Sequence, residues 1–562
     1  MGTLDWIVIA AFFLALIGII IWVVSQKQND SADYFLGGRD ATWIAIGASI
    51  FASNIGSEHL IGLAGAGASS GMAMAHWEIQ GWMILILGWV FVPFYTRSMV
   101  YTMPEFLERR YNPQSRTILS IISLVSYVLT KVAVTVYAGG LVFQQVFGIK
   151  ELWGIDFFWI AAIGLVLLTA LYTIFGGMKS VLYTSVLQTP ILLLGSLVIL
   201  VLGFKELGGW DEMIRICGAV TVNDYGDSMT NLIRSNADPN FPWLGALIGS
   251  SIIGFWYWCT DQFIVQRVLS GKNEKEARRG TIFGAYLKLL PVFLFLIPGM
   301  IAFALHQKYI GDGGFLPMLA NGNPNADAAF PTLVAKLLPA GMKGLVVCGI
   351  LAALMISLAS LFNSSAMLFT IDFYKRFKPQ TSEKKLVLIG QMATVVIVIL
   401  GILWIPIMRS VGDVLYTYLQ DVQSVLAPGI AAAFLLGICW KRTSSQGGMW
   451  GLLSGMIIGL TRLGAKVYYS NVTDASDSIF KYLFYDMNWL FFCGWMFLFC
   501  MIVVILVSLS TEAPSAEKIQ GLVFGTSTPE QKAATRASWD HWDIIHSVII
   551  LGITAAFYWY FW

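Results

Sequence analysis

The chain has 562 residues, of which 57% are hydrophobic and only 12% are charged, and its mean hydropathy is +0.71. A soluble globular protein carries about 25% charged residues, so this composition excludes a soluble enzyme and a disordered chain. The net charge of +2 gives no excess of basic residues for binding a nucleic acid. The sequence therefore predicts a multi-pass protein embedded in a lipid bilayer.

Long apolar runs recur along the whole chain. The first extends over residues 6–25 without a charge, which is long enough to cross about 30 Å of hydrocarbon as a helix. Because no basic region precedes it, we interpret it as a retained helix and not as a signal peptide. The runs are continuous, which excludes a β-barrel and predicts an all-α protein of about fourteen transmembrane helices. The other runs lie near residues 43–66, 73–96, 117–146, 153–175, 181–204, 242–266, 281–305, 340–373, 386–408, 411–439, 447–466, 486–509 and 541–562.

The basic residues orient these helices. If the N-terminus is outside, most of the Lys and Arg residues fall in segments predicted to be inside, as in the clusters around Arg109, Arg278, Arg376 and Lys384. Basic residues concentrate in cytoplasmic loops of membrane proteins. We therefore expect both termini to face outside, in a cell membrane of the inner or plasma type.

Polar residues interrupt two of the apolar runs. The stretch from Ser53 to His59 is too polar and too rich in Gly and Ser for a helix that faces lipid. In the seventh run, Asp261 and Gln262 directly follow an aromatic cluster. Unwound backbone inside a membrane lines a cavity or binds a ligand, and a pair of broken helices indicates inverted repeats. A kink with polar residues buried between helices, and aromatic residues that serve only packing, remain the alternatives.

Further polar side chains lie inside other apolar runs, at Glu78, Lys288 and Gln420. Together with an imidazole and flat aromatic rings, they suit a polyhydroxylated ligand, because each hydroxyl donates and accepts hydrogen bonds. A structural ion pair between Glu78 and Lys288 is equally compatible with the sequence. Lys131 and Arg462 lie near segment ends, so we expect their side chains to extend to the membrane surface.

Hydroxyl groups recur at helical spacing in the ninth run, at Ser357, Ser360 and Ser364. Such oxygens are suitable ligands for an alkali cation. Serine hydroxyls in membrane helices also bond to their own backbone, which is the alternative interpretation.

Several long motifs resemble the sodium/solute symporter family, and most closely its sodium/glucose cotransporter branch. The resemblance extends over about residues 30–470 and implies a LeuT-type fold that works by alternating access. That fold is a 5+5 inverted repeat with one helix before it and three after it. The motifs are NIGSEHLIGLAGAGASSGMA, GWVFVPFY, YTMPEFLERRY, WYWCTDQFIVQRVLS, YLKLLPVF, SLFNSSAMLFTIDFY and LAPGIAAAFLLGICWKR.

The resemblance also implies how the chain is divided. An additional N-terminal helix and an inner loop precede the first five-helix repeat, and an outer loop separates it from the second. A three-helix C-terminal extension follows. In chain order these parts are residues 1–42, 43–205, 206–241, 242–440 and 441–562.

By the same resemblance, the broken helices and their neighbours bind a sugar. Tyr257 is also expected to cover the sugar on its inner side, and Leu63 and Tyr416 to form an outer gate. The positions that match the sugar branch are Asn54, His59, Trp77, Glu78, Tyr257, Trp258, Lys288 and Gln420.

The resemblance further implies sodium as the coupling ion. Two residues depart from the family pattern: Ile356 replaces a serine, and Ser185 replaces an aspartate near a possible second site that includes Ser360. The first change removes a hydroxyl and the second replaces a carboxylate, so we expect weaker sodium binding and looser coupling. The residues that match the shared sodium site are Ala52, Ile55, Ala353 and Ser357.

The sequence thus predicts sodium-driven secondary transport of a hexose of the glucose or galactose type. A carrier of a polyol such as myo-inositol, a weakly or differently coupled carrier, and a sugar sensor on the same fold are the alternatives. An enzyme is not expected, because we find neither a nucleophile–base pair nor a set of metal ligands in the membrane segments. The sequence gives no prediction of the oligomeric state.

Overall fold

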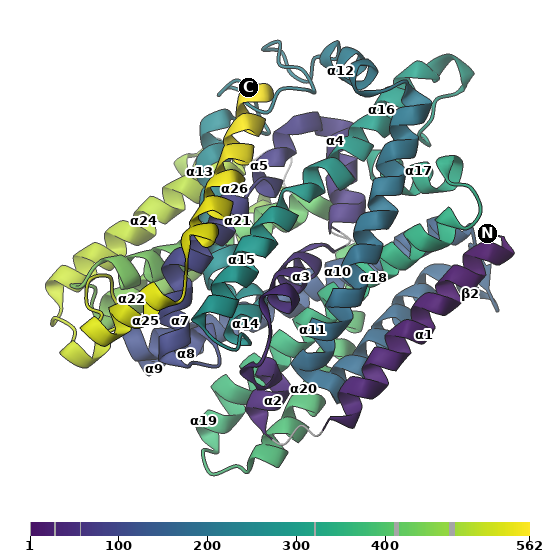
Figure 1. Ribbon diagram of the computed structural model, residues 1–562. Helices are drawn as coiled ribbons and strands as arrows, with labels where there is room; N and C mark the ends of the chain where they lie inside the picture. Colours follow the sequence, from purple (N-terminus) through teal and green to yellow (C-terminus); the bar gives the residue numbers. More distant parts are fainter. Residues whose placement is uncertain (1, 27–29, 57, 320–321, 410–414, 471–477) are drawn as a thin grey trace.

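The computed structural model describes residues 2–26, 30–56, 58–319, 322–409, 415–470 and 478–562, and it is built almost wholly of helices (Figure 1). Within these ranges the only sheet is an antiparallel hairpin of β1 (Glu151–Leu152) and β2 (Ile155–Asp156). The predicted all-α membrane class is confirmed.

The first half of the chain follows the first six apolar runs. Several runs are divided by short π-helical or 3₁₀ turns, which carry the prefix η. The elements are α1 (Thr3–Ser25), α3 (Trp43–Asn54), η2 (Glu58–Leu63), α4 (Ala64–Ser70), η3 (Gly71–Met74), α5 (Ala75–Glu78), α6 (Gly81–Ile86), η4 (Leu87–Phe91), α7 (Val92–Ser98), α9 (Pro113–Ser126), η5 (Tyr127–Val132), α10 (Ala133–Phe147) and α11 (Phe157–Leu207).

The second half follows the other eight runs, although residues 411–414 of one run lie outside the described residues. Its elements are α13 (Trp243–Gly254), η6 (Phe255–Thr260), α14 (Gln262–Leu269), α15 (Glu274–Lys288), η7 (Val292–Leu296), α16 (Ile297–Lys308), α18 (Met342–Met367), η10 (Leu368–Tyr374), α20 (Glu383–Arg409), α21 (Leu415–Cys439), α22 (Ser445–Ser470), α24 (Trp489–Ser510) and α26 (His541–Tyr560). Short helices connect the runs: α2 (Ser31–Leu36), α8 (Met103–Arg110), α12 (Trp210–Gly218), α17 (Ala329–Leu337), α19 (Lys375–Phe377) and α25 (Pro529–Ala537).

Nine helical spans in the described ranges are long and apolar enough to cross a membrane, and some of them contain the short turns named above. One of them, α11, covers two predicted runs, because the helix bends at Gly177, which has φ 53° and ψ −148°. Glycine adopts a positive φ without strain. A Cβ atom at this position would also lie 2.4 Å from the carbonyl oxygen of Tyr34. The bend therefore requires glycine and turns the chain back into the membrane.

The two predicted helix breaks are present. In the first, α3 ends at Asn54, Ile55 has the extended angles φ −81° and ψ 101°, and the helix resumes at Glu58. In the second, Asp261 has φ −76° and ψ 127° between η6 and α14. Its carboxylate accepts the backbone N–H of Phe263 and so caps α14. Both breaks free backbone groups inside the bundle.

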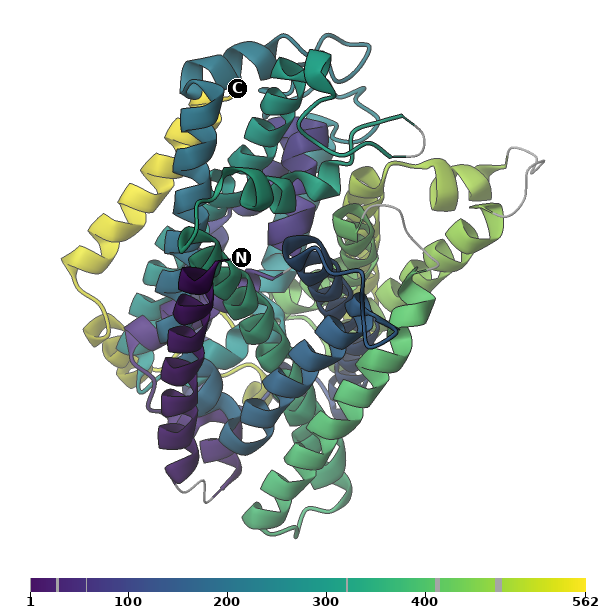
Figure 2. The same cartoon turned by 90° about the vertical axis from the view of Figure 1, so that its right-hand side faces the viewer.

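The core of the bundle lies around α18. The most apolar window of the span that contains α18 is 89% buried, whereas that of α1 is 22% buried. α18 packs against α11, and α3 packs against both α11 and α15. The terminal helices α1 and α26 lie on the periphery (Figures 1 and 2). The polar breaks are therefore enclosed by helices and do not face the lipid.

Both termini pack against segments predicted to be outside. Near the N-terminus, the Asp5 carboxylate accepts the N–H groups of Gly341 and Gly344, at 2.6 and 2.8 Å, where α18 begins. Near the C-terminus, the carbonyl of Phe561 accepts the N–H of Leu232 in the predicted outer loop, at 2.9 Å. Each end of the chain thus packs against a segment that the sequence places outside, and the outward orientation itself stays a prediction.

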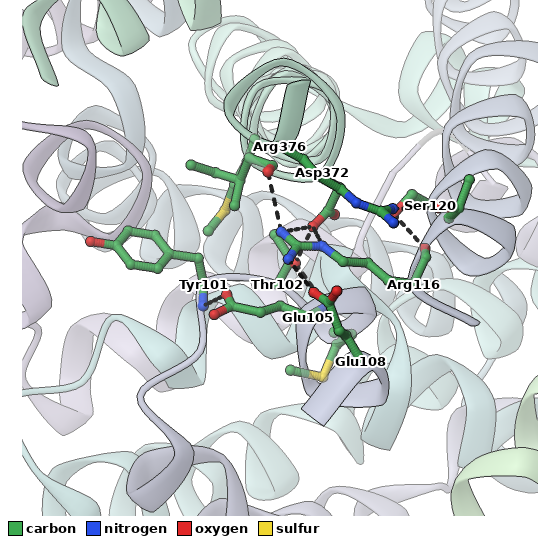
Figure 3. A network of polar contacts seen from close by, with 12 residues as sticks. Tyr101, Thr102, Glu105, Glu108, Arg116, Ser120, Asp372 and Arg376 are labelled. Atoms are coloured by element: carbon green, nitrogen blue, oxygen red, sulfur yellow. Dashed lines mark hydrogen bonds and ion pairs between the residues drawn. The ribbon is translucent and has the colours of Figure 1, made fainter. Parts of the chain in front are cut away.

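A buried ionic network fastens the opposite, basic end (Figure 3). The Arg116 guanidinium lies 2.7 Å from Asp372 and 2.6 Å from Glu108, and the Thr102 hydroxyl donates to the same Asp372 oxygen at 2.8 Å. A buried carboxylate needs such partners, since its desolvation is otherwise uncompensated. The network ties α8 and α9 to η10, at the inner end of the span that contains α18.

Candidate functional site

Three polar side chains from three helices meet at the helix breaks. Asn54, Glu78 and Lys288 are the last residues of α3, α5 and α15. The Lys288 ammonium lies 2.6 Å from the Glu78 carboxylate and 2.9 Å from the Asn54 side-chain oxygen. All three are buried, and the cation benefits from lying at the C-terminus of its helix. The ion pair considered from the sequence is present, and it lies beside the first broken helix.

The second broken helix supplies an aromatic wall. Tyr257 and Trp258 lie on the π-helical turn η6, with their rings nearly perpendicular at 83°. The Tyr257 hydroxyl accepts a hydrogen bond from the Asn54 amide at 3.2 Å. The Lys288 ammonium lies 5.4 Å from the centre of the Trp258 ring. π-Helical turns are frequent at functional sites, and here the turn directs adjacent rings toward the polar cluster.

One small cavity joins the polar cluster and the aromatic wall. Its volume is about 50 Å³, and all eight side chains predicted to contact a sugar line it. Pockets for small ligands usually measure ~300–1,000 Å³, so a six-membered ring requires the walls to move apart. The eight residues are Asn54, His59, Trp77, Glu78, Tyr257, Trp258, Lys288 and Gln420.

Three side chains on this wall carry polar atoms without a hydrogen-bond partner among the described residues. They are Trp77 at its indole N–H, Gln420 at its side-chain oxygen, and His59 at both ring nitrogens. They are only 5%, 7% and 3% exposed, respectively. One ring nitrogen of His59 lies 3.3 Å from Glu78 but outside hydrogen-bond geometry. An unsatisfied buried polar group costs about 1–3 kcal/mol, so the wall is suited to a polar ligand.

The predicted gate residues are placed less fully. Leu63 is completely buried at the end of η2 and is not part of the described cavity wall. Tyr257 lies on the wall. The side chain of Tyr416 lies outside the described residues, so an outer gate remains a prediction.

Four residues of the cavity wall were not predicted from the sequence: the polar Gln80 and Gln423, and the apolar Ile253 and Gly254. Gln423 follows Gln420 by three residues, and this spacing places both amides on the same face of α21. Gln80 lies two residues beyond Glu78 in the same polar motif. Helical spacing from Gln420 would have indicated Gln423, whereas only the fold places Gln80 on the wall.

The prediction that Lys131 and Arg462 extend to the membrane surface is wrong. Lys131 is buried in an ion pair with Asp261 at 2.6 Å, and Asp261 also accepts the hydroxyl of Tyr127. The Arg462 guanidinium donates to the carbonyl of Met487 at 2.9 Å. Both cations turn inward because other segments supply partners, a carboxylate for Lys131 and backbone carbonyls for Arg462, and hydropathy does not reveal such partners.

The residues predicted to bind sodium lie where α3 meets α18. Ala52 is in the last turn of α3, and Ile55 is the first extended residue of the break. The two helices are joined there by a 2.7 Å hydrogen bond between the hydroxyls of Ser53 and Ser360. Ala353 is buried on α18, and Ser357 lines a second cavity of about 20 Å³. Neutral oxygens of this kind fit an alkali cation.

The possible second sodium site has fewer oxygen atoms available to an ion. The Ser185 hydroxyl donates to the carbonyl of Val181, at 2.5 Å, on its own helix. The Ser360 hydroxyl is engaged with Ser53. Both hydroxyls therefore have protein partners, and the aspartate expected from the family resemblance is absent at position 185.

Restoring the missing serine of the first site gives a test of its placement. Ile356 is fully buried next to Ser357 on α18. We expect Ile356→Ser to lower the half-saturating sodium concentration about two- to tenfold, because one more oxygen becomes available to the ion. The measurement is solute uptake at varied sodium, with Ile356→Val as the control that adds no oxygen. An unchanged sodium dependence would show that position 356 does not face the ion.

The chain resembles known proteins over most of its length. Residues 34–455 match the model of the sodium:solute symporter family. The chain is 37% identical over 539 residues to the human sodium/myo-inositol cotransporter 2. The matched region covers 93% of this chain and 79% of that protein. It is 36% identical over 533 residues to the zebrafish sodium/glucose cotransporter 4, and this match covers 92% of this chain and 80% of that protein.

Solved structures share the fold. A Na⁺-coupled sialic acid symporter in a substrate-bound outward-open state has a TM-score of 0.73 at 22% identity, over 92% of this chain and 99% of that one. Mhp1, a nucleobase-cation-symport-1 family transporter in a closed conformation, has a TM-score of 0.50 at 13% identity. That match covers 93% of this chain and 99% of Mhp1. The predicted LeuT-type architecture is thereby confirmed.

Proposed function

Because the chain belongs to the sodium:solute symporter family, and is accordingly a sodium-coupled transporter and not an enzyme, we propose that its solute is a neutral polyhydroxylated six-membered ring. Myo-inositol is the first candidate, and a hexose of the glucose type is the second. The names of relatives 36–38% identical to this chain support that order. The solute occupies the cavity between Asn54, Glu78 and Trp258.

The unpartnered polar atoms on the cavity wall are the observation that carries this proposal. The Gln420 oxygen can accept a hydrogen bond from a hydroxyl, and the Trp77 indole N–H can donate one to a hydroxyl oxygen. The face of the ring that bears C–H groups packs on the aromatic wall of Tyr257 and Trp258. A polyol offers both hydrogen-bond roles at every hydroxyl, so it satisfies all of these groups at once.

The charge balance of the site supports a neutral solute. Glu78 and Lys288 compensate each other at 2.6 Å. A carboxylate or an ammonium on the solute would add an uncompensated charge to this buried site, and burying an unpaired charge is costly. The pair can bind hydroxyls from either side, since the carboxylate accepts hydrogen bonds and the ammonium donates them.

Each helix break is a point at which the helix segments on either side can move relative to each other during the transport cycle. The solute lies between the two broken helices, and alternating access opens the path on one side of it at a time. Sodium would be held by the carbonyls of Ala52, Ile55 and Ala353 with the hydroxyl of Ser357, and its gradient supplies the driving force. The Ser53–Ser360 hydrogen bond links that region to the first broken helix.

A competition experiment tests the solute class. Purified protein in proteoliposomes takes up radiolabelled myo-inositol or glucose under an inward sodium gradient, and unlabelled compounds compete. We expect neutral ring polyols to inhibit uptake, while glucuronate, which has the same ring with a carboxylate, inhibits it at least tenfold less well. Stronger inhibition by charged solutes than by neutral ones would contradict the proposal. Solute binding without any uptake would indicate a sensor.

A further inference from the structure

Gln80 connects the two halves of the candidate site. It lies two residues beyond Glu78 and is buried between that helix and the second broken helix. Its side-chain oxygen accepts the indole N–H of Trp258 at 3.2 Å. Its side-chain nitrogen donates to the backbone carbonyl of Ser250 on α13 at 2.9 Å. Both polar atoms of the amide are therefore engaged by protein groups.

The chemistry of these two partners fixes the orientation of the amide. The indole N–H can only donate, and the carbonyl of Ser250 can only accept. A rotation that exchanged the oxygen and the nitrogen would place donor against donor and acceptor against acceptor. Gln80 therefore holds one orientation and presents one oxygen to the indole.

Gly254 makes this contact possible. A Cβ atom at Gly254 would lie 2.6 Å from the side-chain oxygen of Gln80 and 2.9 Å from its carbonyl carbon, so any larger residue would displace the amide. Gly254 is the last residue of α13, directly before the π-helical turn that carries Trp258. The glycine thus lets the amide lie on the backbone where the aromatic wall begins.

We propose that Gln80 is a positioning residue that sets the specificity of the solute site by fixing the Trp258 indole relative to Glu78. This inference rests on the solute class proposed above. Lys288 lies 2.6 Å from Glu78 and 5.4 Å from the Trp258 ring, so the carboxylate and the indole share one cation. If the indole rotates, the Trp258 ring that packs on the solute and the Glu78 carboxylate that binds its hydroxyls no longer lie at the distance and angle that one solute ring requires.

A double-mutant cycle on solute affinity tests the proposal. The variants are Gln80→Leu, which keeps a branched side chain that is one carbon shorter and makes no hydrogen bond, and Trp258→Phe, which keeps an aromatic ring but has no N–H. We expect Gln80→Leu to raise the half-saturating solute concentration about two- to tenfold with the maximal rate unchanged. In the Trp258→Phe background the same change should have less than a twofold effect. Equal effects in both backgrounds would overturn the proposal.

Two further variants keep the test decisive. We call the two hydrogen bonds of Gln80, to Trp258 and to Ser250, the clamp. Gly254→Ala should displace the amide and raise the half-saturating solute concentration in the wild-type background but not beside Trp258→Phe, which tests the clamp even if Gln80→Leu does not fold. Gln188→Leu is the matched control, because Gln188 is a buried glutamine on α11 that is not part of the described cavity wall. It should leave the half-saturating solute concentration unchanged, and an equal rise in this control would contradict a specific role for Gln80.

The clamp can also be separated from the identity of the solute. The same cycle, measured as melting temperatures of the purified protein without solute, should show that the Gln80→Leu and Trp258→Phe effects are not additive. Additive effects would overturn the clamp whatever the solute is. Non-additive melting in a protein that transports no ring polyol would retain the clamp and overturn only the solute class.

Discussion

Replacing Glu78 by glutamine is expected to abolish saturable solute uptake. The Glu78 carboxylate is 2% exposed and lies 2.6 Å from the Lys288 ammonium. Removing one charge of a buried pair costs about 3–5 kcal/mol, because the other charge stays uncompensated. If that cost falls on the bound state, solute affinity falls about a hundredfold or more. Equilibrium binding of radiolabelled myo-inositol and glucose to the purified variant measures the loss.

A second variant separates charge balance from solute recognition. Glu78→Gln combined with Lys288→Met leaves no unpaired charge, so we expect melting near that of the wild type but still no saturable uptake. Glu212→Gln, at a half-buried glutamate on α12 outside the described cavity wall, is the control that should transport normally. Wild-type affinity in the Glu78→Gln variant would refute the site, and restored uptake in the double variant would reduce the pair to a structural role.

Removing the Lys131 charge is expected to destabilise the protein more than any exposed substitution. Lys131 pairs with the buried carboxylate of Asp261 at 2.6 Å, and its ammonium lies within 5.4 Å of four ring centres: Tyr127, Trp256, Tyr257 and Phe263. Lys131→Met leaves the carboxylate buried and unpaired at a helix break, at a cost of about 3–5 kcal/mol. Thermal unfolding in detergent and the yield of monodisperse protein measure the effect.

A compensating change shows whether charge is the cause. Lys131→Met with Asp261→Asn removes both charges, while the amide can still accept the hydroxyl proton of Tyr127, so most of the lost stability should return. Lys343→Met, at a half-buried lysine that bonds to the carbonyl of Ala335 and has no carboxylate partner among the salt bridges of the described residues, should change stability by no more than about 0.5 kcal/mol. A single variant as stable as the wild type would show that the pair is not needed for folding.

The sequence was most informative at the polar residues that interrupt its apolar runs. Polar residues inside apolar runs are costly, so those that remain usually have a function. This reasoning indicated both helix breaks, at Ile55 and Asp261, before the fold was known. The eight carried-over sugar positions come from six separate helical segments, yet all of them line one cavity. The resemblance to a family, and not composition, selected these eight.

What the sequence did not reveal were the partners of individual side chains. Lys131 and Asp261 are 130 residues apart, and no local pattern joins them. Gln80 was passed over because its two partners, Trp258 and Ser250, lie on a different broken helix. The choice between a hexose and a cyclitol depends on sub-ångström placement of hydroxyl partners, and the hexose named from the sequence is one of two candidates.

Sodium-driven accumulation of a ring polyol tests the central claim most directly. Proteoliposomes with the purified protein receive radiolabelled myo-inositol or glucose with an inward sodium gradient, and matched vesicles receive an equal potassium gradient. The account predicts a transient accumulation above the equilibrium level with sodium alone, abolished by Glu78→Gln. Entry that is equal in both salts and stops at equilibrium would contradict sodium coupling through the altered ion site, and no entry of either polyol would contradict the proposed solute.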